Sequence, residues 1–289
     1  MLSDLETVDG EPWELCPRSL LKKQVGMLAE RGIVLRASFE NEFTVYENST
    51  GAWLPIDQLN CFSSAAMDVA SDFIIPTIAA LEQQGVIVEK YFAEAGSGQQ
   101  EMPVQHQEGV VAADQQVVFK ETVRGVARAQ GLQVSFMPKA DPASAGNGGH
   151  IHMSLWDRES DRNLFYDESD DYELSETARQ FTAGVLAHLP ALLALTAPTT
   201  NSYKRFVERC WSSCYVCWGP DNREATMRVA SGFRGRESST VNLEFKPADP
   251  TCNPYLALSG LICAGLAGID GKLEPGKAML TDPALLSPK

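Results

Sequence analysis

The sequence predicts an α+β fold in one domain that spans residues 1–289. Three observations support this prediction. Segments with helical spacing and segments with strand alternation both occur throughout the chain. No linker or internal repeat divides it. With 289 residues, of which 44% are apolar and 21% are charged, the chain is long and apolar enough to bury a substantial core.

The predicted elements follow in order. Residues 18–31 have helical spacing and precede Gly32, and residues 33–46 then alternate as a strand. Longer helical patterns cover residues 64–85, 110–131 and 174–195. Strands are expected at residues 132–138, 150–156, 214–219, 225–229 and 241–246. A last helix is expected at residues 253–269, where Asn253 can cap the helix and Pro254 suits its first turn.

The overall charge and the termini exclude several functional classes. A formal net charge of −14 argues against a nucleic-acid partner, and much of that charge lies in residues 157–176, which we interpret as a solvated surface loop. The first residues lack a secretory signal, and the longest apolar run, residues 255–269, is too short to cross a bilayer. We therefore expect a cytoplasmic protein without a membrane partner.

Seven cysteines, an odd number without a regular framework, are typical of free thiols in a reducing compartment. Three of them form the segment "CWSSCYVC", whose C-x3-C-x2-C spacing also occurs in iron–sulfur radical enzymes. On a strand, however, Cys214 and Cys217 would point to opposite faces, which is poor geometry for shared iron. We interpret Cys210, Cys214 and Cys217 as small packing residues.

Two pairs of polar residues lie two positions apart on predicted strands. In "FENEF", Glu40 and Glu42 share one strand face, which is either a wet face or a cation site. In "HIHMSLW", His150 and His152 repeat that geometry directly after the flexible run "SAGNGG". Paired imidazoles can bind metal or phosphate, although a chance pair remains an alternative. The isolated His106 and His188 are interpreted as surface or helix-packing residues.

Further acidic and basic residues occur in three short segments. In "EAGSGQQE", a Gly-x-Gly turn can fold Glu94 and Glu101 toward one point. The segments "NSYKRF" and "DNREATMR" supply Arg205, Arg223 and Arg228. Near carboxylates and a metal, arginines would bind phosphoryl oxygens; scattered over the surface, they would only aid solubility.

Six such segments in order resemble the catalytic domain of the glutamine synthetase superfamily. They are "FENEF", "EAGSGQQE", "FMPKADPASAGNGGHIHMSLW", "NSYKRF", "DNREATMR" and "NLEFKPADPTCNPYLAL", and the resemblance covers nearly all of residues 1–272. It implies a glutamine synthetase/guanidino kinase-like fold, a largely antiparallel sheet with flanking helices. It also implies two divalent cations, Mg2+ or Mn2+. The matching ligand positions are Glu42, Glu94 and Glu101 for one ion and Glu40, His150 and Glu244 for the other.

The resemblance further implies a reaction. ATP phosphorylates the γ-carboxylate of glutamate, and an amine then displaces phosphate from the γ-glutamyl phosphate. Arg223 and Arg228 match residues that neutralise the transferring phosphoryl group. His152 and Ser154 match nucleotide contacts. Arg205 matches the partner of the glutamate α-carboxylate, and Gly146 matches a loop that lines the amino acid.

Three substitutions depart from the pattern of the glutamine-forming enzymes. Trp211 occupies the place of a glutamate on a flap loop that shapes the ammonium pocket, and an indole cannot act as a base. Lys246 replaces an arginine, which keeps the charge but loses the bidentate geometry. Asn242 lies where an arginine that contacts ATP is usual. These departures resemble branches that join glutamate to larger amines, so we expect an organic amine. Glutamine formation from ammonium and a non-catalytic role are the alternatives, and a guanidino kinase is less compatible with a carboxylate cluster.

Family members normally have a small β-grasp domain before the segment that matches residues 4–18, and further helices after the segment that matches residues 273–289. We expect this chain to lack both. The family forms rings of identical subunits with active sites between neighbours. The family resemblance thus implies a homo-oligomer. For this chain by itself, we expect weak or heterogeneous assembly.

Overall fold

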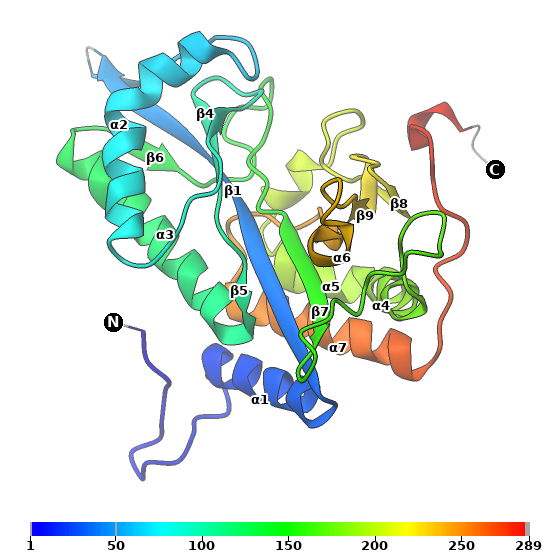
Figure 1. The fold of residues 1–289 in the computed structure, drawn as a ribbon. Coiled ribbons are helices and arrows are strands. Elements are labelled where there is room, and N and C mark those ends of the chain that lie inside the picture. Colours follow the sequence, from blue (N-terminus) through cyan, green and yellow to red (C-terminus); the bar gives the residue numbers. More distant parts are fainter. Residues whose placement is uncertain (1, 50, 287–289) are drawn as a thin grey trace.

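The computed structural model describes residues 2–49 and 51–286. Its centre is a ten-stranded sheet, and seven of the strands form one continuous path (Figure 1). Their order is β3 (Phe92–Ala93), β4 (Gln99–Pro103), β1 (Ile33–Ser49), β7 (Ile151–Asp157), β10 (Asn242–Phe245), β9 (Ala225–Ala230) and β8 (Tyr215–Pro220). The short strands β2 (Ala52–Pro55), β5 (Gln107–Glu108) and β6 (Gln133–Ser135) also pair with β1. Only the β8–β9 pair is parallel among the described strands, which confirms the α+β class and the largely antiparallel sheet.

Strand β1 is the long central strand, and its side chains alternate between two environments. Leu35, Ala37 and Phe39 point into a hydrophobic core, whereas Ser38 and Glu40 line a cavity on the other face. This is the two-residue period of a strand with one apolar face. Apolar core residues and polar cavity residues alternate in the same way on β7 and β10, so the polar side chains of these strands lie on one face of the sheet.

The first core lies beneath β1, β7, β10 and β9 and is covered by helices. These are α1 (Pro17–Glu30), α4 (Glu176–Ala187), α5 (Leu189–Thr196) and α7 (Pro254–Asp270), and Figure 1 shows α7 running behind β1 and β7. Helices α4 and α7 approach closely because both carry glycine at the contact: a Cβ on Gly184 would lie 2.1 Å from the Ala264 carbonyl oxygen. As predicted, the Asn253 side chain caps α7 by accepting hydrogen bonds from the amides of Tyr255 and Leu256.

A second core lies between the other half of β1 and two helices, α2 (Ser64–Glu82) and α3 (Gly109–Ala129). The Phe43 ring lies 6.4 Å from that of Phe73 on α2 and 6.2 Å from that of Phe119 on α3, measured between centroids. Helix α2 has the length and apolar composition of a membrane-spanning helix, but one such helix is weak evidence of a membrane span. One of its faces is packed in this core.

Most predicted elements agree with the structure, with one clear correction. The helix expected over residues 174–195 is two helices, α4 and α5, because Pro190 lies in the first turn of α5 and interrupts the chain at His188. Residues 157–176 form an exposed acidic loop, as predicted, but Phe165 and Leu174 anchor it in the first core. Three short helices complete the described elements: α6 (Glu237–Thr240), η1 (Ser202–Arg205) and η2 (Pro283–Leu285).

Candidate functional site

A cavity of about 1100 Å³ lies on the polar face of the sheet. All fourteen candidate residues that the sequence singles out line it, although they come from six separate segments of the chain. They are Glu40, Glu42, Glu94, Glu101, Gly146, His150, His152, Ser154, Arg205, Trp211, Arg223, Arg228, Glu244 and Lys246. The structure thus brings together the whole predicted set.

Strand register explains much of this convergence. Glu244 on β10 pairs with His152 on β7 at one side and with Arg228 on β9 at the other. On the far side of β1, Glu42 pairs with Glu101 on β4. Because paired residues on antiparallel strands point to the same face, these five side chains enter the cavity together.

The first acidic group consists of Glu42, Glu94 and Glu101. One oxygen of Glu42 accepts hydrogen bonds from Gln99 Nε2 at 2.8 Å and from the Gly148 amide at 2.9 Å. Burial raises the pKa of Glu42 to about 7, and the charges of Glu94 and Glu40 add to this effect. Burial and the three neighbouring carboxylates hold the pKa of Glu101 well above its usual range. The negative charges of this group are therefore not neutralised by the side chains around it.

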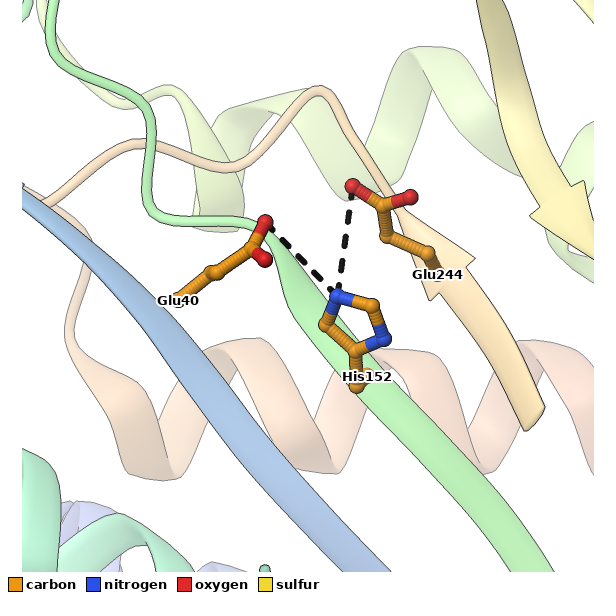
Figure 2. A group of neighbouring side chains, drawn as sticks. All are labelled: Glu40, His152 and Glu244. Carbon is orange, nitrogen blue, oxygen red and sulfur yellow. Dashed lines mark ion pairs between the residues drawn. The ribbon is translucent and has the colours of Figure 1, made fainter. Parts of the chain in front are cut away.

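The second group consists of Glu40, Glu244 and the two histidines. His150 Nδ1 lies 3.0 Å from Glu40 Oε2 and 3.2 Å from Glu244 Oε1. Figure 2 shows that His152 also points between the two carboxylates, with its Nε2 atom at 3.7 Å and 4.0 Å from the same two oxygens. The sequence assigned only His150 to this pair of acids; the structure adds His152 as a second imidazole within reach.

The two histidines differ in their electrostatic surroundings. Burial and the charge of Lys246 lower the pKa of His150 to about 4, so its imidazole is neutral and can serve as a metal ligand. Burial acts to lower the pKa of His152 as well, but Glu40 and Glu244 raise it to about 9. A protonated His152 suits contact with an anion such as phosphate. Its Nδ1 atom lies 2.8 Å from Asn242 Oδ1, which fixes the ring.

Two features of these acidic groups fit divalent cations. Ligand atoms at right angles around a six-coordinate Mg2+ ion, each about 2.1 Å from it, are about 3.0 Å apart. The separations of His150 Nδ1 from Glu40 and Glu244 match this value. In addition, Glu101 Oε1 and His150 Nε2 are buried without a hydrogen-bond partner among the described residues. Buried polar atoms of this kind require a partner, and a cation would supply one for the carboxylate oxygen.

Basic residues surround Glu244, which is only 1% exposed. Arg228 Nη1 donates to Glu244 Oε2 at 3.0 Å, and Lys246 Nζ donates to Oε1 at 3.0 Å. Burial acts to raise the pKa of Glu244, but the positive charges of Lys246 and His152 outweigh it and lower the pKa to about 2. Glu244 is therefore ionised throughout the neutral range.

Arg205 and Gly146 form another wall of the cavity. Nη2 of Arg205 donates to the carbonyl oxygens of Lys246, Pro247 and Ala248 at 2.9–3.1 Å, and its Nε atom is buried without a partner in the described part of the chain. A Cβ on Gly146 would lie 2.2 Å from the Pro138 carbonyl oxygen and 3.0 Å from Arg205 Cγ. Only glycine therefore fits beside this arginine.

The flap loop, residues 207–213, brings Trp211 to the cavity. Trp211 is 40% exposed, and the guanidinium carbon of Arg223 lies 4.9 Å from the centre of its ring. The buried Glu224 carboxylate accepts hydrogen bonds from the amides of Trp211 at 3.0 Å and Arg209 at 3.3 Å. Both of these residues have positive φ, as does Ser213. Cys210 is exposed and lines the cavity, so its interpretation as a packing residue is wrong, whereas Cys214 and Cys217 are partly buried.

Sequence reasoning missed two supporting residues, Gln99, which holds Glu42, and Glu224, which anchors the flap. It singled out Asn242 as a departure from the family pattern but not its contact with His152. The period of two along a strand could have found Gln99, because it shares a strand face with Glu101. His106, interpreted as a surface residue, is exposed and lies at the cavity.

Comparison with known proteins agrees with this geometry. Residues 14–289 match the family profile described as "Glutamine synthetase, catalytic domain". The "Gamma-glutamylpolyamine synthetase GlnA3" of Streptomyces coelicolor is 38% identical over 99% of this chain and 61% of its own length. The "Glutamine synthetase" of Halobacterium salinarum is 36% identical over 98% of this chain and 62% of its own length.

Structural comparison gives the same result. The crystal structure of a "novel glutamine synthase homolog" superposes with a TM-score of 0.86 at 38% identity, covering 94% of this chain and 63% of that one. The chain thus spans about three fifths of the length of the relatives that it matches. The chain belongs to the glutamine synthetase family, whose catalytic domain it matches from residue 14 to residue 289.

Proposed function

We propose that the protein joins the γ-carboxylate of glutamate to an amine at the expense of ATP, through a γ-glutamyl phosphate intermediate. The observation that carries this proposal is the convergence of five carboxylates and two histidines with four basic side chains around one cavity. A carboxylate is a poor electrophile, so it must be activated before an amine can attack it. Such activation requires a site that binds a highly charged nucleotide beside an amino acid.

The acidic groups would hold two divalent cations, one at Glu42, Glu94 and Glu101 and the other at Glu40, His150 and Glu244. When bound, the ions would supply positive charge against the phosphate oxygens. Oxygen-rich ligation of this kind suits Mg2+ or Mn2+. Without cations, so many buried carboxylates would be costly to the fold, which weighs against a purely structural role.

The chain's own basic residues would act on the substrates. Arg223 and Arg228 reach the cavity from β9 and the turn before it, where they would stabilise charge on the transferring phosphoryl group. A protonated His152, with Ser154 two residues on, would contact the nucleotide. Arg205 and Lys246 would bind glutamate carboxylate oxygens, with Gly146 leaving space for the amino acid. Arrangement in a ring of identical subunits remains a prediction from the family resemblance.

The amine is the finer part of the proposal, and Trp211 carries it. An ammonium pocket needs negative charge, to hold a small hydrated cation and to accept its proton before attack. Trp211 offers an aromatic face instead, which favours an apolar amine by burial or a polyamine by cation–π contact. The name of the Streptomyces relative describes such a polyamine product, whereas the relatives named glutamine synthetase support ammonium as the second candidate.

The test is phosphate release by the full-length gene product with glutamate, ATP and a panel of amines that includes ammonium, alkylamines, anilines and polyamines. We expect an organic amine to give the highest kcat/KM. If ammonium gives the highest value, glutamine formation replaces the organic amine. If no amine supports glutamate-dependent phosphate release, the ligase proposal itself fails.

A further inference from the structure

We propose that the thiol of Cys61 is an additional ligand at the metal site formed by Glu42, Glu94 and Glu101. A sulfur donor would make this site accept thiophilic cations such as Zn2+, Co2+ and Cd2+. This inference rests on the proposed function in one respect, because it assumes that a divalent cation binds these carboxylates. The rest of the argument uses the position of Cys61.

Cys61 lies in the turn that precedes α2, and specific contacts fix this turn. The amide of the next residue, Phe62, donates a hydrogen bond to the Ala93 carbonyl oxygen at 2.9 Å. The rings of Phe62 and Phe92 are in edge contact, with 5.4 Å between their centroids. Ala93 directly precedes Glu94, so these contacts hold the turn beside the first acidic group.

The sulfur atom is at a suitable distance from a carboxylate oxygen. Cys61 Sγ lies 3.8 Å from Glu94 Oε2. Around a tetrahedral Zn2+ ion with bonds of about 2.3 Å to sulfur and about 2.0 Å to oxygen, the two donor atoms are about 3.5 Å apart. A shift of a few tenths of an ångström would therefore let both atoms bind one ion.

A second and independent feature indicates that a ligand belongs here. Glu101 is 5% exposed, and its Oε1 atom is buried with no hydrogen-bond partner among the described residues. Glu101 lines the same cavity as Glu94, the residue that Cys61 contacts. A cation bound at Glu94 and Cys61 would supply the missing partner for this buried oxygen.

The sulfur donor changes which ions the site prefers. Carboxylates alone suit Mg2+ and Mn2+, whereas thiolate ligation favours Zn2+ and other softer ions. On binding, the thiol proton passes to solvent and a metal–sulfur bond forms, with no change of oxidation state. Thiophilic ions should consequently compete with Mg2+ at this one site.

The experiment titrates Co2+ and Cd2+ into the full chain and follows the sulfur-to-metal charge-transfer absorption in the ultraviolet. We expect the parent protein to show this band, and Cys61→Ser to lose it and to bind Cd2+ at least about tenfold more weakly. Mn2+ binding, followed by its electron paramagnetic resonance signal, should be unchanged in Cys61→Ser. The control Cys263→Ser, which removes an exposed thiol on α7, should keep the band.

The outcomes separate this inference from the proposed function. If Co2+ binds without the band, or if the band persists in Cys61→Ser, the role of Cys61 is refuted while the carboxylate site stands. If neither Mn2+ nor Co2+ binds, the carboxylate site is refuted together with the role of Cys61. Circular dichroism of Cys61→Ser and Cys61→Ala would show that both variants are folded.

Discussion

Glu42 and Glu101 lie directly opposite each other on the neighbouring antiparallel strands β1 and β4, and both are buried, at 8% and 5% exposure. Like charges in such a cross-strand pair are destabilising. Burial holds the pKa of both carboxyls above the usual range, to about 7 for Glu42. The fold therefore keeps a pair that is stable only when a proton or a cation lies between its members.

The first prediction concerns cations. Millimolar Mn2+ or Mg2+ should raise the melting temperature, because an ion that binds only the folded state stabilises it, by about 2.7 kcal/mol at one hundred times its Kd. Glu101→Ala should abolish most of the gain. Glu101→Gln should make the cation-free protein more stable than the parent, since an amide cannot ionise beside Glu42. Thermal unfolding with and without each ion measures these effects, and an unchanged melting temperature with both ions would refute the metal site.

The second prediction concerns pH. A carboxyl whose pKa is raised in the folded state costs stability as pH rises from its unfolded value, about 4.3, to its folded value. For Glu42 this window ends at about pH 7, so the cation-free protein should lose stability across it. Ligation requires the ionised form, so the gain from Mn2+ should increase over the same window. Melting curves from about pH 5 to about pH 8 measure both slopes, and a gain that does not vary with pH would contradict this account.

Sequence reasoning could place the candidate residues on shared strand faces because strand alternation and short motifs are local. Glu40 and Glu42, or His150 and His152, are fixed on one strand face by the period of two. Most helices and strands follow from similar local patterns. The resemblance in six ordered segments then supplied which of these strands contribute to one site.

Long-range features were out of reach for a physical reason. The register that places Glu244 beside His152 depends on pairing of β10 with β7, two strands far apart along the chain. The hydrogen bonds of Glu224 to the flap depend on loop geometry, which composition does not determine. Pro190 signals the break between α4 and α5. The apolar periodicity on both sides of this proline nevertheless favoured one continuous helix.

The third prediction tests the wall formed by Gly146. A Cβ at this position would meet the Pro138 carbonyl oxygen at 2.2 Å and Arg205 Cγ at 3.0 Å, so Gly146→Ala should displace the loop and Arg205 together. We expect destabilisation by about 1–3 kcal/mol and a raised KM for glutamate. Gly125→Ala is the matched control, because this glycine lies inside α3 with no atom within 4 Å of the added carbon. It should stabilise the protein by about 0.5–1 kcal/mol, and equal melting temperatures for the two variants would contradict the prediction.

The fourth prediction concerns the anchor of the flap. Glu224 accepts hydrogen bonds from the amides of Arg209 and Trp211, residues that adopt positive φ. Glu224→Ala removes both acceptors, so we expect a loss of about 1–3 kcal/mol and faster proteolysis within residues 207–213. Glu224→Gln keeps one acceptor oxygen, so its stability and cleavage rate should lie between those of the parent and of Glu224→Ala. Limited proteolysis and melting curves measure the effect; an unchanged cleavage rate in Glu224→Ala would show that the flap is held by other contacts.

The last prediction tests the amine through Trp211. Burial of an organic amine against the indole is worth about 1–3 kcal/mol, or about 5- to 150-fold in the ratio of kcat/KM values for organic amine and ammonium. Trp211→Glu removes this surface and adds a negative charge, so the ratio should fall by a factor in that range. Trp211→Phe keeps an aromatic face and should retain most of the preference.

The contact between Trp211 and Arg223 complicates the reading of absolute rates. A glutamate at position 211 would face the Arg223 guanidinium, which lies 4.9 Å from the indole ring centre, and an ion pair would draw this arginine away from the phosphoryl group. Turnover with every amine would then decrease by a common factor. The ratio between amines cancels such a factor and is the decisive quantity. A lower rate with an unchanged ratio would mean that Trp211 positions Arg223 and does not select the amine, and ammonium would regain its place as the candidate substrate.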